Sequence, residues 1–163
     1  MTIATDIKGS VRSKILEALH VADGEAREAL AQTKKLMRDD RPKVGEFDPS
    51  RHATSQQCDI LEAKVEAIKQ SICALNNLAV ANQNAVALGA LVELRVTDKT
   101  GKPTQETCFI APPLGKTLFG VEVDGKNILL ITHGGARAEC LLGKRLGDVV
   151  ACRGEQIEIL AVH

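Results

Sequence analysis

The chain has 163 residues, which is enough for one or two small domains with a real hydrophobic core. Its 21 basic and 21 acidic residues give a formal net charge of zero. That balance argues against nonspecific coating of nucleic acid, which needs a surplus of Lys and Arg. The aromatic residues are three Phe, so a base-stacking platform for single-stranded nucleic acid is nearly excluded. We recognise neither a secretory signal nor a run long enough to span a membrane, and we expect a cytoplasmic protein without membrane contact.

The first half of the chain, residues 1–82, predicts two helices because apolar positions recur at alternating steps of four and three. The first series is Ile15, Leu19, Ala22, Ala26, Ala29, Thr33 and Leu36, and the second is Cys58, Leu61, Val65, Ile68, Ile72, Leu75 and Ala79. Small residues dominate the first series and larger ones the second, so the two stripes can interdigitate. The connecting stretch is short, which favours an antiparallel coiled-coil hairpin within a monomer over a parallel dimer.

Proline and capping signals locate the tip of this hairpin. Pro42 disfavours helical backbone at the residue before it, so the first helix should end near residues 38–40. Asp48 followed by Pro49 is a strong start signal, with Asp as the N-cap and Pro at the first helical position. The tip then covers about residues 39–48. Helical arms of about 26 residues would hold it roughly 40 Å from the base of the hairpin.

The second half, residues 83–163, holds ten of the 13 Gly, so it predicts short strands between turns. The polar residues 82–84, where the two halves meet, are suited to a linker. We expect strands at 92–96, 104–111, 119–124, 127–132, 149–153 and 156–162, and a short helix within 134–142. Gly125 after Asp124 predicts a tight hairpin turn. The expected fold class is α+β: a helical coiled-coil hairpin, then a small, mostly antiparallel sheet domain with one short helix.

Five cysteines, at positions 58, 73, 108, 140 and 152, form no CxxC pair. Zinc sites and disulfide frameworks have tighter spacing, so we predict small buried apolar residues in a reducing cytosol.

No nucleophile elbow, P-loop, HExxH or dinucleotide-binding fingerprint occurs in the chain. One cluster of side chains is a candidate functional site, namely the carboxylates of the tip: Asp39, Asp40, Glu46 and Asp48. Carboxylates held together on a projecting loop can bind Mg²⁺. Two other interpretations stay open, because Asp48 already caps a helix and because Arg38, Arg41, Lys43 and Arg51 balance the acidic charge there.

Near the end of the chain, residues 131–148 read ITHGGARAECLLGKRLGD. This segment resembles the GreA/GreB family of bacterial transcript-cleavage factors, whose second domain has a pattern like S-P-L-G-R-A-L-L-G-K-K-V-G-D before a final strand pair. The matching residues are Leu141, Leu142, Gly143, Lys144, Arg145, Gly147 and Asp148. Leu88-Gly89, followed by Val92 to Leu94, is similar to the way that domain opens. In organisation, the resemblance covers nearly the whole chain.

The resemblance implies an FKBP-like second domain and a transcription elongation factor that binds bacterial RNA polymerase. Its globular domain would dock at the secondary channel, with residues 141–144 as partner-binding residues. Its hairpin would enter the channel and briefly contact the 3′ end of the nascent RNA. The tip acids Asp39, Asp40, Glu46 and Asp48 would help to hold a Mg²⁺ in the polymerase active centre, where the metal activates water to cut the backtracked transcript. The factor itself would be no enzyme and would hold no permanent cofactor.

Two departures from the family pattern leave alternatives open. The S-P-L-G motif falls on residues 135–138, which read Gly-Ala-Arg-Ala. The family's acidic tip pattern, D-L-x-E-N-A-E-Y-H-A, aligned through His52 and Ala53, places its acids at Val44 and Phe47. A shifted alignment restores Asp39, Asp40 or Glu46 instead.

Three other functions remain as hypotheses. One is a channel-binding transcription regulator that does not support cleavage. Another is a peptidyl-prolyl isomerase, although that activity needs an aromatic pocket and the second half has only Phe109 and Phe119. The last is a coiled-coil adaptor without polymerase contact.

Overall fold

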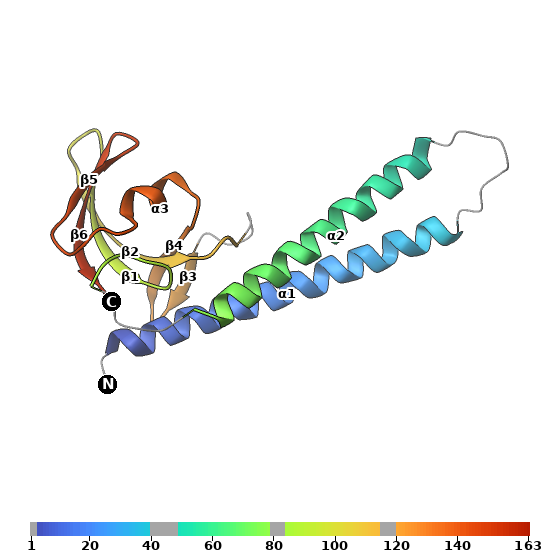
Figure 1. Cartoon of the computed structure of the whole chain (residues 1–163), viewed down its shortest axis with the longest axis horizontal. Helices are drawn as coiled ribbons and strands as arrows, with labels where there is room; N and C mark the ends of the chain where they lie inside the picture. Colours follow the sequence, from blue (N-terminus) through green and yellow to red (C-terminus); the bar gives the residue numbers. More distant parts are fainter. Residues whose placement is uncertain (1–2, 40–48, 79–83, 115–119) are drawn as a thin grey trace.

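The structure, a computed structural model, describes residues 3–39, 49–78, 84–114 and 120–163. Two long helices, α1 (Ile3–Asp39) and α2 (Pro49–Asn76), run side by side as an antiparallel hairpin that extends well beyond a small sheet domain (Figure 1). They have 37 and 28 residues, so both arms are longer than expected. The two helix ends that face the tip, Asp39 and Pro49, are those that the proline and capping signals predict. Within the described residues, no helix combines the length and the hydropathy that a membrane crossing needs.

The interface between α1 and α2 confirms most of the predicted apolar stripe. Its buried members are Ile15, Leu19, Ala26, Cys58, Val65, Ile68 and Leu75. Ala79, the last predicted position of the stripe, lies outside the described residues. The prediction is wrong at the distal end of α1, where the side chain of Leu36 is 66% exposed. Met37 turns toward α2 instead, and the Cys58 thiol lies 3.4 Å from its Sδ. A helix has 3.6 residues per turn, so a strict 3.5-residue repeat drifts around it, and the contact has moved by one residue in the last turn.

The described residues of the second half form one six-stranded sheet with one short helix, α3 (Ala136–Leu141). The strands are β1 (Leu91–Thr97), β2 (Pro103–Ala111), β3 (Gly120–Val123), β4 (Lys126–Thr132), β5 (Val149–Cys152) and β6 (Glu155–Val162). Their order in the sheet is β3-β4-β2-β1-β6-β5. All neighbouring strands are antiparallel except β2 and β4, which are parallel. The sheet is therefore mixed, because the chain reverses at both ends of β3 before β4 returns beside β2.

Two tight hairpins close the sheet edges. Asp124 and Gly125 have φ values of 51° and 73°, and Arg153 and Gly154 have 51° and 86°. Two consecutive residues with positive φ are typical of a type I′ turn, whose twist matches that of the paired strands. The predicted turn with Asp-Gly at its head is confirmed.

The two faces of the sheet bury different sets of residues. One face packs against α3 through β1 side chains such as Val92 and Leu94. The other face carries Leu91, Phe109 and Ile128 into a cluster with side chains from the base of the hairpin. That cluster includes Val11, Ile15 and Leu19 of α1 and Leu75 of α2. The hairpin base and the sheet therefore share one hydrophobic core, whereas a domain boundary at residue 82 stays a prediction.

The cysteines divide into buried and accessible ones. Cys58, Cys108 and Cys152 are buried as predicted, but Cys73 is exposed and Cys140 is only partly buried; all five are free thiols. The prediction is wrong for Cys73 because it follows Ile72 on α2 and projects away from the stripe that contacts α1.

Candidate functional site

The distal end of the hairpin contains the predicted metal-binding carboxylates. Asp39 is the last residue of α1 and is exposed. Asp40, Glu46 and Asp48 lie outside the described residues, so the four carboxylates stay a prediction as a set. Within the described ranges, no group of three or more His, Cys, Asp or Glu side chains is arranged to hold a metal. Asp39 alone can offer an oxygen ligand but cannot enclose a cation.

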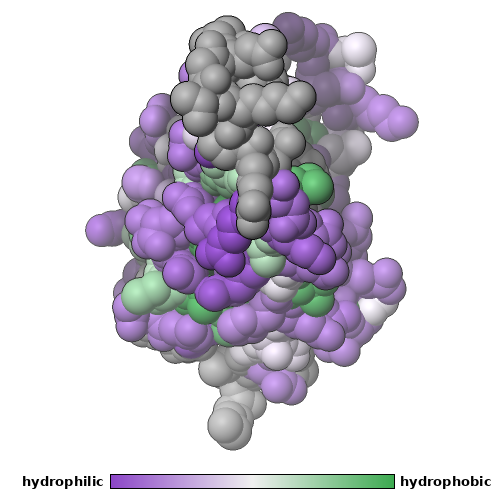
Figure 2. All heavy atoms as spheres, turned by 90° about the vertical axis from the view of Figure 1, so that its right-hand side faces the viewer, coloured by the Kyte–Doolittle hydropathy of each residue, from purple (hydrophilic) through white to green (hydrophobic). Residues whose placement is uncertain are grey.

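A shallow hollow lies between the last turn of α1 and the first turns of α2. It is lined by Leu36, Met37, Asp39, Ser50, Arg51 and Thr54. The C-terminal end of a helix carries a partial negative charge, which adds to the Asp39 carboxylate and favours a cation. Arg51 brings a positive charge to the same hollow, so the site is mixed in charge. The molecule seen from this end is mainly hydrophilic (Figure 2).

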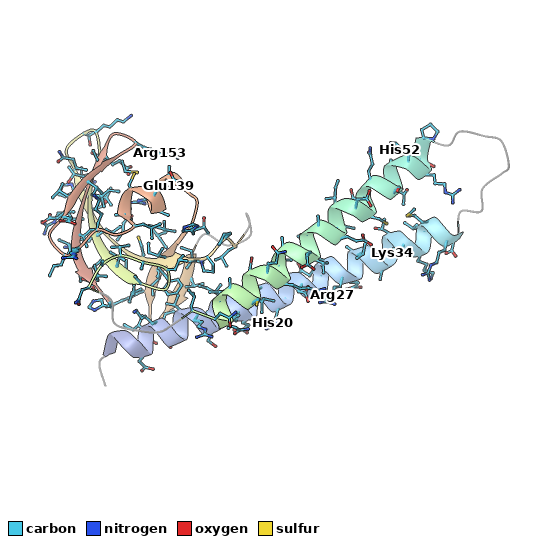
Figure 3. All side chains as sticks on the ribbon, in the orientation of Figure 1. His20, Arg27, Lys34, His52, Glu139 and Arg153 are labelled. Atoms are coloured by element: carbon cyan, nitrogen blue, oxygen red, sulfur yellow. The ribbon has the colours of Figure 1, made fainter. Side chains whose placement is uncertain are left out.

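An ion pair crosses the hairpin near this end, and two further side-chain contacts lie within α2. The Lys34 ammonium of α1 lies 2.7 Å from a Glu62 carboxylate oxygen of α2. Both side chains are about half exposed, so this ion pair contributes little stability. At the start of α2, the Thr54 hydroxyl donates to the Ser50 carbonyl at 2.9 Å. His52 lies on the same turn, at the distal end of α2 (Figure 3), and its Nε2 is 3.2 Å from the Gln56 side-chain amide.

The predicted partner-binding residues, Leu141 to Lys144, begin at the last residue of α3 and are only partly on the surface. Leu141 is fully buried and belongs to the core between α3 and the sheet. Leu142 is partly buried, whereas Gly143 and Lys144 are exposed. The Gly143 N–H donates to the Val86 carbonyl at 2.8 Å, and the Val86 N–H donates to the Lys144 carbonyl at 2.7 Å. This pairing fixes the segment against the start of the sheet domain. Gly143 has a φ of 77°, a conformation that favours glycine.

The turn that follows and the first residue of β5 present two apolar side chains that sequence reasoning missed. Leu146 is 66% exposed and Val149 is 60% exposed. The turn is well ordered by hydrogen bonds, because the Arg145 N–H donates to Asp148 Oδ2 at 2.8 Å and the Gly147 N–H donates to the Ile159 carbonyl at 2.8 Å. The signal that the sequence offered was Leu146, an apolar residue between Arg145 and Gly147 within a turn. Exposed apolar side chains on a fixed turn are suited to contact another protein.

The departure from the family pattern at residues 135–138 has a structural role in this chain. Gly135 precedes α3, and a Cβ there would lie 3.1 Å from the Thr132 carbonyl oxygen. Arg137 Nη2 donates to Glu106 Oε2 at 2.7 Å, which joins α3 to β2. Its Nε is buried and lacks a hydrogen-bond partner among the described residues. Arg137 is therefore tied to β2 by an ion pair, while 29% of its side chain stays exposed.

The residues considered for an isomerase pocket do not line one. Phe109 is 2% exposed and packs in the core under the hairpin, and Phe119 lies outside the described residues. An open hollow on the sheet is lined by Glu93, Gln105, Glu106, Thr107, Lys126, Asn127 and Leu129. This lining is mostly polar and has no aromatic ring.

No family model matches this chain, and no curated protein matches it. Several solved structures, in contrast, are similar to it. A structure of the transcription factor Gfh1 has 19% identity, covers 91% of this chain and 92% of its own, and has a TM-score of 0.36. GreA factor homolog 1 (Gfh1) of Thermus thermophilus has 20% identity, coverage of 91% and 94%, and a TM-score of 0.34. Gfh1 of Thermus aquaticus has 19% identity, coverage of 90% and 92%, and a TM-score of 0.36. Three of the solved structures to which this chain is similar are thus structures of Gfh1, a GreA factor homolog.

Proposed function

We propose that this protein binds bacterial RNA polymerase, inserts its helical hairpin into the secondary channel and promotes cleavage of backtracked transcripts. One observation supports this most: a long arm carries a carboxylate, Asp39, at its far end and is packed at its base onto the domain that bears the LLGKRLGD segment. The 28 residues of α2 correspond to a reach of about 40 Å. An arm of this kind can deliver a side chain deep into a narrow passage while the domain stays outside.

Docking would use the exposed residues of the segment that resembles the family pattern, residues 141–148. Lys144 and the apolar Leu146 project from a turn fixed by backbone hydrogen bonds. A basic and an apolar side chain side by side suit a protein surface with both acidic and apolar groups. Leu141 would act indirectly, because it is buried and holds the segment in place.

The described residues suit a metal ion that is held jointly with the polymerase better than one that this protein binds alone. A single carboxylate, Asp39, supplies one oxygen ligand, whereas Mg²⁺ needs six ligands in nearly octahedral geometry. Asp39, with Asp40, Glu46 and Asp48, would lend oxygen ligands to a Mg²⁺ whose other ligands belong to the polymerase. A metal bound there would supply an activated water for phosphodiester hydrolysis. The protein's own task is to bring carboxylates to that point.

A second candidate, a channel-binding regulator without cleavage activity, is favoured by the mixed charge at the tip. Arg51 lines the same hollow as Asp39, and Arg38 precedes Asp39 on α1. A cationic group beside the carboxylate competes with the metal for it. On this alternative, the hairpin would occupy the channel without completing a metal site.

Stalled, backtracked complexes of purified bacterial RNA polymerase separate the two candidates. The protein should shorten the RNA in these complexes. The double variant Asp39→Ala/Asp40→Ala should reduce the cleavage rate at least about tenfold and leave polymerase binding unchanged, because only metal ligands are lost. Binding is measured by fluorescence anisotropy of the labelled protein.

A matched control removes two exposed acids from the shaft of the hairpin, as Glu17→Ala/Asp59→Ala. This control should cleave like the wild type. Binding of the wild type without any RNA shortening would support the non-cleaving regulator. Absence of binding would contradict both candidates and favour an adaptor.

A further inference from the structure

Two of the five cysteines meet in the sheet domain. Cys140 lies on α3 and Cys152 ends β5, and their Sγ atoms are 2.8 Å apart. Both are free thiols. They are 12 positions apart in the sequence, so only the fold brings them together. None of the functional roles proposed above uses either residue.

The separation is close to bonding distance. A disulfide S–S bond is about 2.05 Å long, so closing it here needs a movement of only about 0.8 Å. Cys58 makes a useful contrast, because its nearest sulfur belongs to the thioether of Met37 at 3.4 Å, which cannot form a disulfide. The Cys140–Cys152 pair therefore has the geometry of a dithiol that is ready to be oxidised.

The surroundings assign different roles to the two sulfurs. Cys140 is partly exposed, and Cys152 is 4% exposed. The hydrogen bond with Cys140, together with burial, raises the pKa of the Cys152 thiol, while the nearby Arg137 and Arg153 charges act in the opposite direction. Arg153 lies in the turn after β5 (Figure 3). The sulfur that an oxidant reaches first is that of Cys140.

We propose that Cys140 and Cys152 are a modification site that forms a reversible intramolecular disulfide with a peroxide as oxidant. The Cys140 thiolate attacks one peroxide oxygen, the O–O bond breaks, and hydroxide leaves, which gives a sulfenic acid. The Cys152 sulfur then attacks the Cys140 sulfur, the S–O bond breaks, and water leaves. In total, two thiols lose two electrons and two protons, and one hydrogen peroxide becomes two waters.

The disulfide would join α3 to β5 and close a loop over residues 140–152. That loop contains Lys144, Leu146 and the hydrogen-bonded turn of residues 145–148. Oxidation would thus restrain the segment that we assign to docking, and this consequence alone rests on the proposed function. Disulfides in a reducing compartment are characteristically transient and redox-sensing.

Peptide mapping of the free protein tests the site directly. Trypsin places the two cysteines in different peptides, residues 138–144 and 146–153. After treatment with hydrogen peroxide and blocking of the remaining thiols, the two peptides should appear linked, lighter by two hydrogens than their sum. Dithiothreitol should separate them. Free thiol at both positions should fall at least about tenfold further than at the exposed Cys73.

Matched variants keep the outcome decisive. Cys73→Ser should give the same linked peptides, whereas Cys140→Ser, at a partly exposed helical position, should abolish them and leave the circular dichroism spectrum unchanged. Sulfinic or sulfonic acid on Cys140 without linkage would overturn the proposal, as would covalent dimers in place of the internal link. Because no polymerase is present, failure here is distinguishable from failure of the proposed function.

Discussion

The base of the hairpin and its distal half consist of the same two helices but are stabilised in different ways. At the base, Val11, Ile15 and Leu19 are at most 1% exposed and pack against both α2 and the sheet. Beyond Ala26, α1 contributes only partly exposed side chains to the contact with α2. The base is anchored by a core of large side chains, whereas the distal half, as far as the described residues show, is a slender arm held by contacts between its own two helices. An arm of this kind leaves its end accessible to a partner.

Polar contacts sharpen this contrast. At the base, the Ser71 hydroxyl donates to the Pro113 carbonyl at 2.7 Å, and Lys14 Nζ donates to the Glu122 carbonyl. These bonds join the hairpin to the sheet domain. In the middle of the arm, Arg27 Nε pairs with Asp23 Oδ2 at 2.6 Å within α1 (Figure 3), so this contact holds the helix without anchoring it elsewhere.

The largest expected effect comes from truncating the base. Ile15→Ala removes a side chain that is 0% exposed and leaves a cavity, so we expect a loss of about 2–5 kcal/mol in unfolding free energy. Leu36→Ala, at a position 66% exposed in the distal arm, should change it by less than about 0.5 kcal/mol. Urea unfolding followed by circular dichroism measures both. Equal losses would mean that the distal arm is as tightly packed as the base.

An intermediate effect concerns alkaline pH and the sheet core. Burial, more than the nearby Glu106 charge, raises the pKa of Cys108 from 9.0 to about 12. Between these values the folded thiol stays protonated while the unfolded thiol ionises. The contribution of Cys108 to the free energy of unfolding is therefore fully present below pH 9.0. Above pH 9.0 it falls by up to about 1.4 kcal/mol per pH unit.

Cys108→Ala should remove this component of the pH dependence, although it lowers stability at neutral pH. Urea titrations of both proteins from pH 8 to pH 10.5 give the difference in slope. Identical slopes for the wild type and the variant would show that Cys108 is not shielded from water.

The smallest expected effect lies in the arm. Gly24 is exposed inside α1, and a Cβ there would meet nothing within 4 Å. Gly24→Ala should stabilise the helix by about 0.5–1 kcal/mol, because alanine loses less backbone entropy. Amide hydrogen exchange of residues 26–38 should slow. Gly9→Ala, with equal space near the base, is the matched control and should leave the exchange of these amides unchanged.

Local sequence signals predicted the ends of the elements well. Pro42 and the Asp48-Pro49 pair located the two helix ends at the tip, because the proline ring restricts backbone conformation through steric contacts within one or two residues. Asp124 and Gly125 predicted their turn for a similar reason, since few residues adopt a positive φ readily. These effects act over a few residues and can be read without knowledge of the fold.

The exposure of the predicted site residues depends on longer-range packing, and it was predicted less well than the ends of the elements. Leu141 matches the family pattern but is buried, while Leu146 and Val149 carry the exposed apolar surface of the same segment. Periodicity alone could not choose between Leu36 and Met37, because the choice depends on how far two long helices coil around each other. Of the tip carboxylates, only Asp39 falls within the described residues.

The sequence by itself determined a helical hairpin followed by a small sheet domain, since apolar periodicity and turn residues are encoded locally. Tertiary structure alone decided that β4 lies parallel to β2, that the hairpin base shares a core with the sheet, and that Cys140 meets Cys152. The physical reason is that these contacts join residues distant in the chain. Their free energy comes from burying surfaces that exist only when both elements have formed.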